Sequence, residues 1–234
     1  MNVQPKRIYF TQRHPSLTPD RFVSRWRQHG QLAMHFMAKQ DWENVIRYVH
    51  CDAVHDSGIP GIDDQWDGMG IILFRDANAR KRHIAFMEAR AALEADEDAT
   101  FFARVNRHGF VAREQVLHPG PGGRIKLVRA FKRLEGISIA DFEQCWQIRH
   151  VPETQACFSP ALLRQVANWP LLPEAATGWG LDCDVVEELW FESVDTLRRS
   201  TATGADPLHR PALQDTATQQ LAVVTSELQL YPAP

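Results

Sequence analysis

The sequence lacks the excess of positive charge that nucleic-acid-binding proteins carry. Its 234 residues include 26 Lys and Arg against 29 Asp and Glu, which gives a net charge of −3. Phosphate neutralisation requires a cationic surface, so we do not expect a nucleic-acid partner. Long apolar runs are absent too: no uncharged stretch approaches the roughly 20 residues that span a bilayer, and the N-terminus has no apolar signal core. A cytoplasmic protein with no membrane partner is therefore expected.

Cysteine is also scarce. The four cysteines, Cys51, Cys145, Cys157 and Cys183, form no C-x-x-C pair and show no regular spacing, which argues against a zinc ribbon or a disulfide framework and fits reduced thiols. Motifs for nucleotide binding, serine hydrolases and zincins are missing as well. The stretch HCDAVHD at 50–56 offers imidazole, thiol and carboxylate groups, but its spacing matches no known metal site. We expect neither a metal nor a cofactor.

What the sequence does contain is an internal repeat. Phe22 and Trp26 recur 120 residues later as Phe142 and Trp146, and GIILFRDANA corresponds to EELWFESVDT at an offset of 117. Each half alternates β-rich runs and capped helices in the order βαββαβ, which is that of a ferredoxin-like unit. One such unit leaves one face of its sheet apolar, and two copies on one chain can cover each other.

We therefore expect an α+β protein in which two ferredoxin-like βαββαβ repeats pack sheet to sheet as an intrachain α/β barrel. The first repeat would span 1–117 and the second 124–234, joined by a linker at 118–123, whose HPGPGG is the stretch richest in Pro and Gly. Within the first repeat, the pattern predicts a helix near 78–93 that ends where the acidic run 94–98 begins.

A Phe-Trp-His pattern at helical spacing occurs once in each half, and two further motifs follow in the second half. They are Phe22, Trp26 and His29; Phe142, Trp146 and His150; LWFES at 189–193; and TSEL at 225–228. This combination resembles the EthD family, named from ethyl tert-butyl ether degradation, within the dimeric α/β-barrel superfamily. Most such proteins have one copy and build the barrel by dimerisation. The resemblance implies that here one chain forms the barrel alone, with a homodimer of two-repeat chains as a further assembly to consider.

The two halves differ in the spacing from Trp to His. Trp146 and His150 are four residues apart, as in the family pattern, whereas Trp26 and His29 are three apart. Both separations keep the two side chains on one helix face. Each residue turns an α-helix by roughly 100°, however, so we expect the two imidazoles to point in different directions. His150 is accordingly favoured over His29 as the catalytic acid–base residue.

The chemistry expected of these residues is acid–base catalysis without a cofactor. The candidates are His150, His29 and Tyr48 as catalytic groups and Trp146, Trp26 and Arg149 as substrate-binding groups. A histidine ordinarily titrates near pH 6.5 and can move protons at neutral pH, and a strand tyrosine can hold a substrate oxygen. Each has a structural alternative: a histidine that complements a helix end, and Trp or Tyr side chains that pack in the core.

The resemblance implies a small-molecule ligand, apolar or aromatic and oxygenated, bound between sheet and helices. A cofactor-independent lyase or isomerase of a catabolic or polyketide-like pathway is the function expected first. A non-catalytic small-molecule-binding accessory protein is the alternative from another class. A haem-dependent oxidoreductase ranks third, because some members of the wider superfamily bind haem. The fold by itself does not choose among them.

Overall fold

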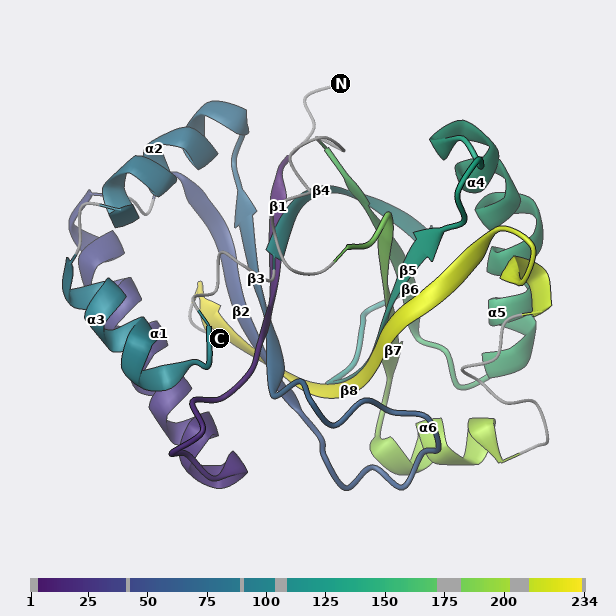
Figure 1. The fold of residues 1–234 in the computed structure, drawn as a ribbon, viewed down its shortest axis with the longest axis horizontal. Helices are drawn as coiled ribbons and strands as arrows, with labels where there is room; N and C mark the ends of the chain where they lie inside the picture. The colour runs from purple at the N-terminus through teal and green to yellow at the C-terminus, as the bar shows by residue number, and fades with distance from the viewer. Residues whose placement is uncertain are drawn as a thin grey trace.

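The computed structural model of the chain describes residues 4–40, 43–88, 91–103, 109–171, 182–202 and 211–232. Eight antiparallel strands close into a barrel, and helices cover the outside of the barrel on two opposite sides (Figure 1). The expected α+β barrel is therefore observed. Within the described residues, none of the helices is both long and apolar enough to cross a membrane.

The first half of the chain supplies four strands and three helices. They are β1 (Lys6–Thr11), α1 (Pro19–Gln40), β2 (Val45–Ala53), β3 (Gly68–Phe74), α2 (Ala77–Glu88), α3 (Ala91–Thr100) and β4 (Gly109–His118). The prediction that the helix ends near residue 93 is wrong, because α3 continues to Thr100 and contains the acidic run. Its carboxylates are accommodated by tertiary contacts rather than by the helix end: Asp96 pairs with Arg25 and His29 of α1.

The second half supplies the other four strands. Its elements are β5 (Ile125–Arg133), α4 (Ile139–Cys145), the π-helix η2 (Trp146–His150), α5 (Val151–Phe158), β6 (Arg164–Pro170), β7 (Val185–Phe191), α6 (Val194–Thr201), the short 3₁₀ helix η4 (Pro211–Leu213) and β8 (Ala217–Tyr231). Ser138 caps α4, because its side chain accepts a hydrogen bond from the backbone N–H of Asp141. The capped helix start expected from the sequence is thus present.

The strands follow the order β1-β3-β2-β8-β5-β7-β6-β4 around the barrel, and β4 returns to β1. Each half therefore contributes four neighbouring strands, β4-β1-β3-β2 and β8-β5-β7-β6. The halves join edge to edge, where β2 pairs with β8 and β4 pairs with β6. Each of these eight strands has a partner on both sides, so the barrel presents no open edge among them.

The strand registers correspond between the halves. Lys6 of β1 lies opposite Leu73 of β3, and Lys126, 120 residues later, lies opposite Trp190, 117 residues after Leu73. The pairings of β2 with β3 and of β6 with β7 match in the same way. We call two positions register-equivalent when their strand pairings correspond in this manner.

Successive strand residues face alternately into the barrel and out toward the helices. One apolar cluster, which includes Phe10, Met69 and Val223, fills part of the barrel interior. Separate apolar clusters lie between the sheet and the helices, one of them around Trp26 and another around Trp146, and both indoles are fully buried. Polar side chains buried in these two environments therefore stand out as candidates for function.

Candidate functional site

Three polar side chains of the first half lie on the helix-facing side of the sheet. The hydroxyl oxygens of Tyr9 and Tyr48 are 3.3 Å apart, and Nε2 of His50 is 2.9 Å from the Tyr48 oxygen. All three side chains are almost completely buried. Tyr48 and His50 share one face of β2, as the alternation of the predicted strand requires.

The hydrogen bonds of this cluster run in a defined direction. Nη1 of Arg27 is 2.8 Å from Nδ1 of His50, and a guanidinium can only donate, so Nδ1 accepts. The neutral imidazole then carries its proton on Nε2 and donates it to Tyr48, whose own hydroxyl proton is left to point at Tyr9. Burial, followed by the charge of Arg27, lowers the pKa of His50 well below its ordinary value, which keeps the ring neutral.

Packing holds the His50 imidazole in a fixed orientation. Trp26 stacks on it with ring centroids 4.0 Å apart and an interplanar angle of 14°. Gly30 of α1 lies against the other part of the ring: a Cβ at this position would come within 2.9 Å of the His50 Cε1 atom. Trp26, expected to line a ligand site, instead supports a histidine that the sequence analysis did not include among its site residues.

His29 forms a second polar group at the end of this layer, between α1 and α3. Its Nδ1 atom is 2.7 Å from Oδ2 of Asp96, which also pairs with Arg25. Burial lowers the pKa of His29, although Asp96 opposes the shift. The neutral ring donates from Nδ1 to the carboxylate, which makes Nε2 the basic nitrogen. Arg25 also lines a surface hollow along the outer side of α1.

In the second half, His150 belongs to a fully buried ionic cluster. Its Nε2 atom is 3.3 Å from Glu187 of β7. Arg129 donates to the same carboxylate from Nε at 2.9 Å, and Gln165 donates to it at 2.8 Å. Burial disfavours the charged carboxylate, but Arg129 and then His150 hold the pKa of Glu187 well below its ordinary value. These partners of His150 were not predicted from the sequence.

The same sheet positions thus carry different chemistry in the two halves. Tyr9 and Gly70 face each other on β1 and β3, and their register equivalents on β5 and β7 are Arg129 and Glu187. The absence of a side chain at Gly70 leaves room for the Tyr9 ring, since a Cβ there would lie 2.0 Å from the Tyr9 Cζ atom. A phenol cluster in one half corresponds to an ion pair in the other.

The difference in spacing between Trp and His has a structural counterpart. Trp146 through His150 form a π-helix, in which the hydrogen bond spans one residue more than in an α-helix. The extra residue is absorbed there, and the His150 ring stays 4.1 Å from Trp146 and turns toward the sheet. His29, on a regular α-helix, turns toward α3 instead. The two imidazoles point to different elements, as the spacing predicts.

Arg149 lies apart from these groups. Its guanidinium is half-exposed and pairs with Asp215 at 3.0 Å on the surface. The structure does not bring it together with His150, whose contacts lie on the sheet side of the helix. Of the residues expected to bind substrate, Trp26 and Trp146 are therefore packed beside the two candidate histidines, while Arg149 is not.

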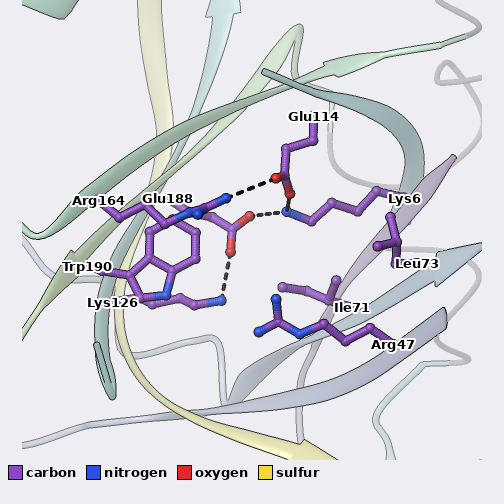
Figure 2. A pocket seen from close by; sticks show the side chains of 9 residues that line it. All are labelled: Lys6, Arg47, Ile71, Leu73, Glu114, Lys126, Arg164, Glu188 and Trp190. Carbon is purple, nitrogen blue, oxygen red and sulfur yellow. Dashed lines mark hydrogen bonds and ion pairs between the residues drawn. The ribbon is translucent and has the colours of Figure 1, made fainter. Parts of the chain in front are cut away.

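A cavity also lies inside the barrel, on the opposite face of the strands (Figure 2). It is lined by Lys6, Arg47, Ile71, Leu73, Glu114, Lys126, Arg164, Glu188 and Trp190. Its volume of about 30 Å³ is enough for about two water molecules. Sequence reasoning missed this site, although its lysines recur at the same offset of 120 as the Trp residues.

His50 and His150, the two histidines that face the sheet, do not fit haem as they stand. An axial ligand needs a free ring nitrogen that faces a porphyrin-sized slot. Both nitrogens of His50 are bonded, and its ring lies against Trp26. His150 is held between Glu187 and an indole. Across the described ranges, no three His, Cys, Asp or Glu side chains are grouped so that they could hold a metal ion.

A family model described as the EthD domain matches residues 14–104. Among solved structures, the chain is similar to a candidate monooxygenase from Fusobacterium nucleatum, with a TM-score of 0.58, 8% identity and coverage of 97% of this chain and 93% of that one. A candidate chlorite dismutase matches with a TM-score of 0.54, 7% identity and coverage of 97% and 95%. A haem-binding protein from Thermus thermophilus matches with a TM-score of 0.52, 11% identity and coverage of 97% of this chain and 92% of that one. No curated protein matches the chain.

Proposed function

We propose, from the match of residues 14–104 to the EthD domain, that the chain is a cofactor-independent lyase or isomerase acting on a small, oxygenated, apolar or aromatic metabolite. The observation that carries the proposal is the contact of 2.7 Å between His29 and Asp96. A carboxylate that accepts from Nδ1 fixes the tautomer of a histidine and leaves Nε2 as a base. Such a pair can remove a proton from carbon without a cofactor.

In the proposed reaction His29 takes a proton from a carbon beside a substrate carbonyl and returns it at another position. The developing oxyanion requires a hydrogen-bond donor. Tyr9 suits this role with the support of Tyr48, which donates to the Tyr9 oxygen and leaves the Tyr9 O–H to face the substrate. Burial raises the pKa of Tyr9 to about 12 and also raises that of Tyr48. Both hydroxyls therefore keep their protons at neutral pH. The donation of His50 to Tyr48 orients them.

Two arguments favour His29 over His150. Glu187, the carboxylate bonded to His150, is already neutralised by Arg129 in a fully buried cluster, which is typical of a structural ion pair. The EthD match also falls in the first half. This reverses the order expected from the spacing, and His150 is the second candidate of the same proposal.

We further infer that the chain is a tandem duplication of two ferredoxin-like repeats, 1–117 and 124–234, with 118–123 as the linker. The equal strand orders of the two halves and their matching registers support this. In this interpretation the fused chain replaces a dimer of single-copy proteins, and only one of the two repeats has to be catalytically active.

Hydrogen–deuterium exchange tests the proposed function even while the substrate is unidentified. A panel of small aromatic and aliphatic ketones, lactones and keto acids is incubated with the protein in D₂O, and the loss of C–H signals is followed by NMR. We expect exchange with at least one member. His29→Asn should slow it by about 10²-fold, the usual loss for a general base, and Asp96→Asn should slow it less.

The matched control is His150→Asn, which should leave most of the exchange rate. The opposite order of the two variants would assign the reaction to the second half. Binding of a panel member with no exchange in any form would favour the accessory-protein alternative. A Soret band in the purified protein would favour the haem alternative.

A further inference from the structure

Seven charged side chains of alternating sign run across one end of the barrel interior, each from a different strand. In order they are Arg164, Glu114, Lys6, Glu188, Lys126, Glu227 and Arg47. They belong to β6, β4, β1, β7, β5, β8 and β2, so β3 alone contributes no charge. We call this group the charge chain. Six of its members are seen in Figure 2, around the cavity.

The middle of the charge chain is deeply buried. Nζ of Lys6 is 2.9 Å from Glu114 and is also bonded to Glu188. Glu188 in turn accepts from Nζ of Lys126 at 2.7 Å, and both lysines and Glu188 are less than 5% exposed. The arrangement satisfies Glu188 on both oxygens. Charges so far from water are stable only when paired in this way.

Six of the seven members form register-equivalent pairs. Lys6 corresponds to Lys126, because they lie opposite Leu73 and Trp190. The same pairings relate Arg47 to Arg164. Glu114 and Glu227 likewise correspond, the first lying opposite Asn168 of β6 and the second opposite Cys51 of β2.

Glu188 has no charged counterpart. Its register equivalent, 117 residues earlier, is Ile71 of β3, which lines the cavity and is buried. A carboxylate at that position would face the same two lysines from the opposite side. The charge chain would then hold four cations and four anions. As it stands, it has four cations and three anions, and the apolar side chain of Ile71 occupies the place of a fourth anion.

The groups next to Ile71 have hydrogen-bonding capacity to spare. Lys6 has three N–H donors and uses two of them on Glu114 and Glu188. The buried Nε atom of Arg47 makes no hydrogen bond among the described residues, although its Nη2 pairs with Glu227. Lys126 directs a further donor at the thiol of Cys51 at 3.6 Å, and a thiol is a weak acceptor.

We propose that this cavity binds a small planar oxyanion, a carboxylate of about the size of formate or acetate, whose charge takes the place of the carboxylate missing at Ile71. Arg47 offers the fork of donors that carboxylates bind best, and Lys6 provides the second cation. The cavity volume of about 30 Å³ limits the part that enters to a few atoms. This site lies on the other face of the strands from Tyr48 and His29, so it is independent of the proposed enzymatic function.

The first test is binding of acetate to the unmodified protein. Isothermal titration calorimetry and the thermal unfolding midpoint are measured in sodium acetate and in sodium chloride at equal ionic strength. We expect saturable, acetate-specific heat and a higher midpoint in acetate. Arg47→Gln should weaken binding at least tenfold. Its side chain is half-exposed, so this variant should still fold.

The second test replaces the proposed bound anion with a carboxylate that belongs to the chain itself. Ile71→Glu places a carboxylate at the proposed anion position, and Ile71→Gln places a group of the same shape without the charge. An ordinary buried apolar site tolerates Gln better than Glu. We expect the reverse order here, with a higher unfolding midpoint for Ile71→Glu and loss of its response to acetate.

Three results would overturn the proposal. The first is the absence of any acetate-specific effect in the unmodified protein. The second is binding that survives Arg47→Gln with unchanged affinity. The third is an Ile71→Glu protein that unfolds at a lower temperature than Ile71→Gln. If Ile71→Glu fails to fold while Ile71→Gln folds, that outcome counts with the third.

Discussion

Arg27 and His50 are joined at 2.8 Å through Nη1 and Nδ1, and this contact decides which nitrogen of a buried imidazole carries the proton. The arginine cannot accept, so the imidazole must, and the hydrogen-bond direction through Tyr48 follows from that. A partly buried residue of α1 thereby sets the orientation of hydroxyl groups on β1 and β2. The same contact disfavours protonation of His50, with a consequence for stability.

We predict that the free energy of unfolding decreases as the pH falls from 7.5 to 5.5. His29 and His50 have lowered pKa values in the folded protein, mainly through burial. Their contribution is fully present above the unfolded pKa of about 6.5 and is lost as the pH falls from there toward the folded values. The slope should reach about 1.4 kcal/mol per pH unit for each histidine.

Urea denaturation at several pH values between these limits measures the slope. His50→Gln should reduce it, because one of the two histidines that bind a proton only on unfolding is removed. An unchanged slope in this variant would show that His50 is not held neutral. The comparison stays above pH 5.5, where carboxylates are still ionised.

The Arg129–Glu187 pair should behave as a structural ion pair. Glu187→Gln leaves the Arg129 charge buried without its main partner, and we expect a loss of about 3–5 kcal/mol in the free energy of unfolding. The double variant Arg129→Met with Glu187→Met removes both charges and should be less destabilised than either single change. Guanidinium denaturation of Glu187→Gln, Arg129→Met and the double variant checks the order. A double variant worse than both singles would contradict a mainly structural role.

Deletion of Ile148 should remove the π-turn at modest cost. This exposed residue lies within Trp146–His150, where the chain already contains one residue more than an α-helix needs. Its loss leaves the Trp and His three residues apart, as in the first half. We expect a folded protein destabilised by roughly 1 kcal/mol, about the average effect of a point mutation.

Deletion of Gln28 is the matched control for that prediction. Gln28 is also exposed and lies between Trp26 and His29, but α1 is an α-helix there. Removal of one residue rotates everything that follows by roughly 100° and turns buried side chains outward. It should destabilise the protein far more than deletion of Ile148. Equal effects in denaturation experiments would mean that the π-turn does not absorb the extra residue.

The sequence was sufficient to predict the barrel because its signals are local and repeated. Alternating apolar runs, turn residues and helix caps occur twice at nearly constant offsets, and the closed strand order satisfies the apolar faces that such runs create. The end of the helix near 93 was misplaced for the opposite reason. The acidic run looked like a helix end, whereas Asp96 is balanced by α1, a partner distant in sequence.

The candidate site was only partly predictable. His29, Tyr48 and His150 could be named from spacing and strand alternation. Glu187 and Arg129 could not, because charged residues within strands look exposed until the partner strand is known. The charge chain was hidden for the same reason. The repeat offered two signals, the recurrence of Lys6 as Lys126 at an offset of 120 and of Arg47 as Arg164 at an offset of 117. They become meaningful only once these side chains are known to face the barrel interior.

The odd number of residues in the charge chain has an evolutionary meaning. In an exact two-fold homodimer, whatever occupies one side of the axis must occupy the other, so position 71 and position 188 would be identical. Such a dimer could carry two glutamates or two isoleucines there, but not one of each. A single chain with Ile71 and Glu188 escapes that restriction. Asymmetry at the centre of the barrel is thus open to a single chain and closed to any assembly of identical chains related by an exact two-fold axis.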